Sequence, residues 1–191
     1  RTCDFSGSKT VVLNMLQHLM AQDQVKIICW IGQMFTGGNL QGSGELPTAQ
    51  FTVVNDASVI RADALTNGDG GQVIVWANGT TQFAGYISAQ GGDTAGDGGF
   101  VEVSGLETLN FIGDVDTDAP NGASGTLLLD PTDITITAGV AAGIFDGEVL
   151  FGDAGPTLIS EAQIESLAGN TNITIQASNS ITIEQLSNLI L

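Results

Sequence analysis

Residues 68–76 read Gly-Asp-Gly-Gly-Gln-Val-Ile-Val-Trp, and the same pattern returns twice further along the chain. It returns at residues 96–104 as Gly-Asp-Gly-Gly-Phe-Val-Glu-Val-Ser and at residues 122–130 as Gly-Ala-Ser-Gly-Thr-Leu-Leu-Leu-Asp. The spacing between equivalent glycines is 28 residues and then 26 residues. Such internal repeats are the signature of a fold built from stacked units.

A second strand repeats in phase with the first, because residues 83–87 and 111–115 align at a spacing of 28 residues. Ile60 precedes Ile87 by 27 residues, so residues 59–63 carry the same strand one repeat earlier. Apolar residues alternate at a period of two, as in strands with one buried face. The alternation predicts inward stacks of Val73/Val101/Leu127, Val75/Val103/Leu129, Ile60/Ile87/Val115 and Ala62/Ala89/Thr117.

Short strands separated by glycine-rich turns, with a period near 27 residues, predict an all-β fold. The specific prediction is a right-handed parallel β-helix (β-solenoid), in which each coil of about 27 residues pairs with the next. Antiparallel hairpins would not need a constant period, and a β-propeller blade would need about 40–45 residues. The glycines at the turns fit corners that require a positive φ.

Three regions are expected along the chain. Residues 37–131 form the regular β-helix coils, and residues 132–191 continue with Ile-rich strands. One short helix is predicted near residues 160–167, because Ser160 is a suitable N-cap and early acids follow it. Residues 1–36 differ in composition from the rest and form an anomalous N-terminal segment.

Within residues 1–36, apolar residues fall at helical spacing at Val12, Met15, Leu16, Leu19 and Met20. Two interpretations stay open: a short N-terminal helix that caps the solenoid, or out-of-frame translation. Polar residues interrupt the apolar stretches of this segment, which argues against a signal peptide or a membrane-spanning helix. The sequence does not decide whether the only two cysteines, Cys3 and Cys29, form a disulfide.

Charge is divided unevenly along the chain. The 191 residues include 4 Lys and Arg against 21 Asp and Glu, a net charge of −17. All four basic residues lie in residues 1–61, so the acids of residues 62–191 carry the excess. This excludes a general nucleic-acid binder or a binder of anionic membranes, since both need a basic surface. Strand alternation places the outward acids in stacks with polar residues: Arg61/Ser88/Asp116 and Asp63/Gln90/Asp118.

The sequence patterns that suggest a chemical site match the known motifs only weakly. Asp114, Asp116 and Asp118 superficially resemble a calcium loop, but Ala119 and Gly125 stand where an EF-hand has glycine and glutamate. The Gly-Asp-Gly-Gly turns lack the following helix and lysine of a phosphate-binding loop. The sequence therefore predicts no catalytic, cofactor-binding or metal-binding residues and no cofactor.

Two aromatic residues are expected to face outward, Trp76 and Phe100. Trp76 lies in register with Ser104 and Asp130, and Phe100 lies beside Gln72 and Thr126. Exposed rings on a polar face could stack on sugars or anchor a partner. The alternative is that a loop or the N-terminal segment covers them.

The repeats resemble filamentous-haemagglutinin-type exoproteins, the large secreted adhesins of two-partner secretion systems. The resemblance is carried by the order and spacing of residues 37–49, 59–65, 70–77, 98–105 and 125–131. It implies a β-helix exported through an outer-membrane pore partner. The family's secretion domain, with its Asn-Pro-Asn motifs, is absent here, so we expect a piece downstream of it.

The expected function is that of a structural rod or interaction segment in cell adhesion, outside the cell or on its surface. The expected partners are the outer-membrane pore of the full-length protein and a glycan or another ligand on a host or neighbouring cell. Neither nucleic acid binding nor membrane spanning is expected. We expect no enzyme; the alternatives are a carbohydrate-active β-helix enzyme, which needs a pair of carboxylates, and a calcium-stabilised surface module.

Overall fold

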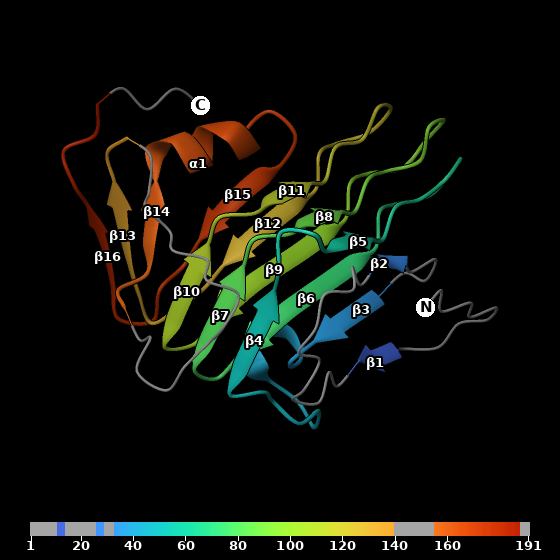
Figure 1. Ribbon diagram of the computed structural model, residues 1–191. Coiled ribbons are helices and arrows are strands. Elements are labelled where there is room, and N and C mark those ends of the chain that lie inside the picture. Colours follow the sequence, from blue (N-terminus) through green and yellow to red (C-terminus); the bar gives the residue numbers. More distant parts are fainter. Residues whose placement is uncertain (1–10, 14–25, 29–32, 140–154, 188–191) are drawn as a thin grey trace.

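The computed structural model describes residues 11–13, 26–28, 33–139 and 155–187. In these residues the protein is all-β, with several parallel sheets and one short α-helix (Figure 1). None of the described helices is long and apolar enough to cross a membrane.

The strands form four sheets, and every pairing between strands is parallel. The first sheet contains, in spatial order, β1 (Val11–Leu13), β3 (Gln33–Thr36), β6 (Gln72–Ala77), β9 (Phe100–Gly105), β12 (Thr126–Leu129) and β15 (Asn172–Ile175). The second contains β4 (Phe51–Val54), β7 (Thr80–Phe83) and β10 (Thr108–Phe111). The third contains β2 (Lys26–Ile28), β5 (Val59–Arg61), β8 (Tyr86–Ser88) and β11 (Asp114–Asp116). The fourth contains β14 (Leu158–Ser160), β13 (Asp133–Thr137) and β16 (Ser180–Ile183).

The repeats predicted from the sequence set the strand register. Each of two successive repeats contributes one strand to each of the first three sheets: β6, β7 and β8, then β9, β10 and β11. All three pairs keep the expected spacing of 28 residues, as in Gln72 with Phe100 and Tyr86 with Asp114. The next pair in the first sheet, β9 with β12, keeps the expected spacing of 26.

The main core lies on the inward faces of these sheets. Val73, Val101 and Leu127 are fully buried and paired in register, so the predicted inward stack is confirmed. The stack of Ile60, Ile87 and Val115 and the stack of Ala62, Ala89 and Thr117 are also buried, with at most 5% of any side chain exposed. Between the second-sheet strands β7 and β10, the rings of Phe83 and Phe111 stack with centroids 5.3 Å apart. Burial of these apolar rows is the main stabilising contribution to the stack.

The glycine turns bring neighbouring repeats into close backbone contact. Gly68 and Gly96 have φ values of 127° and 123°, so the prediction of a positive φ is correct at these two positions. It is wrong for the other glycines of these two turns, whose φ values are not positive: Gly70, Gly71, Gly98 and Gly99. A Cβ on Gly98 would lie 1.8 Å from the carbonyl oxygen of Thr117, so the backbone approach excludes a side chain there.

The C-terminal region departs from the repeats. The predicted helix is confirmed as α1 (Glu161–Leu167), and the Ser160 side chain accepts a hydrogen bond from the amide of Gln163 as its N-cap. The Gln163 side chain donates to the carbonyl of Gly113, beside the last strand of the third sheet, β11 (2.9 Å). The Thr171 hydroxyl donates to the carbonyl of Val115 in β11 itself (3.1 Å). This helix and the segment after it therefore lie along β11 where a further strand of the third sheet would otherwise pair (Figure 1).

The described parts of residues 1–36 are strands. β1 and β3 belong to the first sheet, and β2 pairs with β5 in the third sheet. Val12 lies in β1, so it is not part of a helix. The other four residues of the predicted N-terminal helix, and both cysteines, lie outside the described residues.

Candidate functional site

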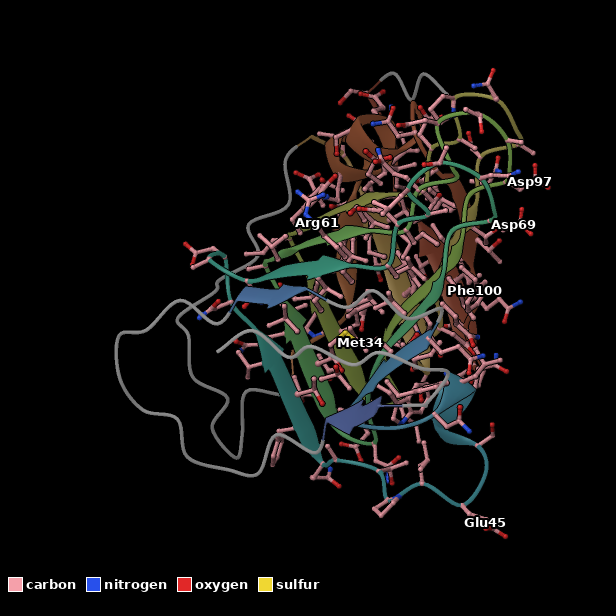
Figure 2. All side chains as sticks on the ribbon, turned by 90° about the vertical axis from the view of Figure 1, so that its right-hand side faces the viewer. Met34, Glu45, Arg61, Asp69, Asp97 and Phe100 are labelled. Carbon is pink, nitrogen blue, oxygen red and sulfur yellow. The ribbon has the colours of Figure 1, made fainter. Side chains whose placement is uncertain are left out.

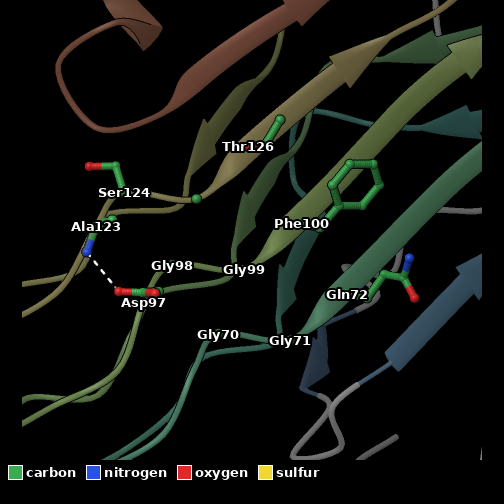
Figure 3. Close-up of a pocket in the computed structure, with 11 residues that line it drawn as sticks. Gly70, Gly71, Gln72, Asp97, Gly98, Gly99, Phe100, Ala123, Ser124 and Thr126 are labelled. Carbon is green, nitrogen blue, oxygen red and sulfur yellow. Dashed lines mark hydrogen bonds between the residues drawn. The ribbon is translucent and has the colours of Figure 1, made fainter.

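A shallow groove crosses the outer face of the first sheet, where three strands begin (Figure 3). Gln72, Phe100 and Thr126 are paired in register and stand side by side along it. Each of them begins a strand directly after a glycine-containing turn, which supplies the floor: Gly70 and Gly71, Gly98 and Gly99, and Ser124 and Gly125. The sequence-predicted outward position of Phe100 beside Gln72 and Thr126 is confirmed.

The floor is backbone because side chains do not fit there. A Cβ on Gly99 would lie 2.1 Å from the carbonyl oxygen of Gly71, and one on Gly125 would lie 2.0 Å from that of Gly99. The close approach of neighbouring repeats therefore keeps Gly99 and Gly125 free of side chains. The ring of Phe100, which is half-buried, is the only aromatic side chain among the described residues that lines the groove.

The glycine amides of the floor are all engaged within the protein. Those of Gly70 and Gly98 donate to the carbonyl groups of Asp97 and Ala123, both at 2.8 Å. The amides of the other three glycines also donate to protein carbonyl groups: Gly71, Gly99 and Gly125. A phosphate-binding loop needs free amides that point at the anion. The groove therefore lacks the donors of an anion site, which agrees with the absence of a phosphate-loop motif.

The groove is also acidic rather than basic. Asp97 lines it, and its carboxylate accepts a hydrogen bond from the amide of Ala123 (2.8 Å). Figure 2 shows Asp69, Asp97 and Phe100 along one side of the molecule and Arg61 toward the other. Arg61 is the only basic residue whose side chain the structure describes. No described cation therefore faces the groove.

A segment of residues 37–49, which we call the strap, lies on the outer face of the first sheet next to the groove. Trp76 is only 3% exposed and packs against Gly38 and Gly42 of the strap. Its indole nitrogen donates to the side chain of Asn78 (3.2 Å), which in turn donates to the Thr48 hydroxyl. Of the two interpretations given to Trp76, the one in which another segment covers the ring is thus confirmed.

The strap also covers a glutamate. The Glu102 side chain has no exposed surface, and its two carboxylate oxygens accept from the Gln41 amide at 3.0 and 3.2 Å. Gln41 has a φ of 50°, in the left-handed region that residues with side chains rarely adopt. Its side chain donates to the carboxylate of Asp130 (2.6 Å), so one strap residue contacts two acids.

Burial raises the pKa of Glu102 from 4.5 to about 7, because the charged form loses its hydration. The Gln41 amide and the Ser104 side chain lower this pKa in part, and the negative charge of Asp130 raises it. Glu102 was not singled out from the sequence, where the alternation of Val101 and Val103 puts it on the outward face. It does face outward, but the strap covers it. A usable signal was present, because the equivalent positions in the neighbouring strands are the apolar residues Ile74 and Leu128.

The outward stacks of the third sheet form a polar network. Arg61 makes an ion pair with Asp63 (3.4 Å) and lies 5.8 Å from the ring centroid of Tyr86. The Tyr86 hydroxyl donates to Asp116, and burial together with the Asp116 charge raises the pKa of Tyr86. Ser88 is fully buried within this network, although its outward position predicted exposure. These contacts join neighbouring strands across the outer face of the third sheet.

Of the three acids that resemble a calcium loop, Asp116 uses its carboxylate to bind the backbone and this network. One Asp116 oxygen accepts from the amide of Asp118, and the other accepts from Tyr86 and Gln90. In the described part of the chain, no group of three or more His, Cys, Asp or Glu residues comes together to hold a metal ion. Asp114, Asp116 and Asp118 are therefore not brought together as one such group in the described residues.

Models of known protein families give no match to this chain, and no curated protein matches its sequence.

Proposed function

We propose that this chain is a right-handed parallel β-helix and forms a rod-like segment of a secreted, surface-exposed, adhesin-like exoprotein. The observation that carries the proposal is the constant register of parallel strands in three sheets across successive repeats. A chain that coils once per repeat produces this register, because each strand then pairs with its equivalent one coil later. The repeats resemble those of filamentous-haemagglutinin-type proteins, and that resemblance supplies the functional class.

The mechanism of such a segment is mechanical. Stacked coils give a rigid body whose outer faces carry binding groups, and its acidic side chains keep it soluble. In the longer protein we expect export through an outer-membrane pore partner and a location on the cell surface.

We do not propose enzymatic activity. Glu102 and Asp130 form the one pair of acids that a single strap residue, Gln41, contacts, and a raised pKa is typical of a general acid. A glycosidase, however, needs its two carboxyl groups beside the scissile bond. Glu102 has no exposed surface under the strap, so no substrate can reach it in this structure.

A passenger experiment tests the proposal. The full chain is inserted, in phase with the repeats, into the β-helical region of an exported filamentous-haemagglutinin-type protein, and surface display is measured by antibody binding to intact cells. We expect display to persist and the filament to lengthen in electron micrographs. The control insert has the same composition with the residues shuffled. Loss of display with both inserts, or a filament of unchanged length, would contradict the proposal.

A further inference from the structure

The groove over the first sheet has the features of a site for a linear polymer. Gln72, Phe100 and Thr126 come from three neighbouring strands, so their contact points follow one another at about 4.8 Å, the spacing of paired strands. Much of the floor is glycine backbone, at Gly70, Gly71, Gly98, Gly99 and Gly125, with only the short side chains of Ala123 and Ser124 beside it. An extended ligand can therefore lie across the strands and contact each repeat in turn (Figure 3).

Phe100 supplies a preformed aromatic surface. Its ring packs against the small cluster of Phe35, Ile74 and Trp76 on the outer face of the sheet. This backing holds the ring in place, so little conformational entropy is lost when a ligand stacks on it. The face of an aromatic ring is electron-rich and attracts the weakly positive C–H groups of a sugar ring.

The groove offers polar side chains that suit hydroxyl groups. The Gln72 side-chain oxygen accepts from Gln33 (3.1 Å), which leaves its NH₂ group as a donor toward a ligand. Asp97 has a carboxylate oxygen beyond the one bonded to Ala123, and Thr126 has a hydroxyl that both donates and accepts. Sugar hydroxyls need both kinds of partner.

The charges of the groove select against anions. No described cation faces it, its glycine amides are engaged, and Asp97 repels negative groups. We propose that this groove binds an uncharged linear glycan, with Phe100 stacked on a sugar ring. The proposal rests on the proposed function, since it names the ligand class for a surface-exposed rod.

Calorimetry with the full chain tests this site. The probes are uncharged oligosaccharides of two to eight sugars, from β-glucan and mannan, and anionic ones from polygalacturonate and heparan sulfate. We expect binding to an uncharged series that tightens with chain length, and none to the anionic probes. Phe100→Ala should weaken binding about tenfold or more, because it removes both the aromatic contact with the sugar and the apolar area buried by that contact.

Two further variants keep the result decisive. Phe100→Leu retains an apolar contact with the small cluster but removes the aromatic face, so it should also weaken binding even if Phe100→Ala destabilises the sheet. The matched control is Phe51→Ala, which removes an exposed phenylalanine from the second sheet and should leave affinity unchanged. Equal effects of Phe51→Ala and Phe100→Leu, tighter binding of anionic probes, or no binding of any uncharged probe would overturn the glycan site. None of these results would affect the display experiment, so failure of the site and failure of the rod proposal are distinguishable.

Discussion

The two faces of the first sheet are built from the same strands but are buried in different ways. On the inward face, Val73, Val101 and Leu127 are apolar and fully buried by the other sheets. On the outward face, Ile74 and Glu102 are equally buried, but a single strap of residues 37–49 lies over this face. Alternation therefore assigns each residue to a face, and it does not say whether the outward face meets water.

The difference predicts two kinds of response to mutation. The inward face is shared by several sheets, so damage there affects the unfolding of the whole stack. Among the described residues the outward face is covered by the strap, and we expect the strap to detach while the sheets stay paired. Local opening of this kind has a lower free energy than global unfolding.

The largest effect is expected inside the stack. Phe111→Ala removes a ring that is 2% exposed and stacked on Phe83, so the free energy of unfolding should fall by about 3–5 kcal/mol. Urea denaturation followed by circular dichroism measures this loss. Phe51→Ala, at a ring that is 39% exposed in the same sheet, should cost far less. Equal losses for the two variants would show that the inward row is not the main core.

A smaller and local effect is expected under the strap. Trp76→Ala removes the indole that packs against Gly38 and Gly42, and it should destabilise strap docking by up to about 3 kcal/mol. Hydrogen exchange should speed up in residues 37–49 and stay slow in residues 100–116. Uniformly faster exchange across both segments would mean that the strap does not detach independently.

Much of the fold was predictable because the repeat fixes the register. The equivalent glycines and the alternating apolar residues place Val73 beside Val101, and the structure pairs them as expected. The helix after Ser160 was also predictable, since its cap is a local signal. The position of that helix along β11 was not, because the contact between Gln163 and Gly113 spans 50 residues and follows no pattern in the sequence.

The groove could be predicted from the repeat, whereas the contacts of the strap could not. The row of Gln72, Phe100 and Thr126 follows from the repeat, so the sequence placed Phe100 correctly. The buried state of Glu102 depends on Gln41, 61 residues earlier, in the strap, which was expected to belong to the regular coils but lies over the outer face of the sheet. Periodicity carries no information about such a contact, so the contact that buries Glu102 could not be predicted from the repeat.

The raised pKa of Glu102 makes stability depend on pH. Since the folded carboxyl has a pKa of about 7 against 4.5 when unfolded, the folded chain binds an extra proton between these values. The contribution of Glu102 to the free energy of unfolding is fully present below pH 4.5 and is lost as the pH rises through about 7. We expect a loss of about 3 kcal/mol across this window. Urea unfolding at several pH values from 4.5 to 7.5 measures it.

Glu102→Gln is the matched variant, because glutamine keeps the shape and an oxygen for the Gln41 amide but does not titrate. Its free energy of unfolding should lack the decline of the original chain between pH 4.5 and 7. A variant that keeps the full decline would assign the effect to another group.

The smallest effect is expected at an acid that does face water. Asp114 is exposed on the third sheet, in register with Tyr86, and like Glu102 it occupies an outward position of its strand. Asp114→Asn removes one of many negative charges without leaving a buried group unpaired, so unfolding should change by less than about 0.5 kcal/mol. Its free energy of unfolding should change with pH in parallel with that of the original chain, whereas Glu102→Gln should make this free energy nearly independent of pH between 4.5 and 7. If both variants had this effect, the pH dependence would come from the summed charge of the acids, and the strap would have no special part in it.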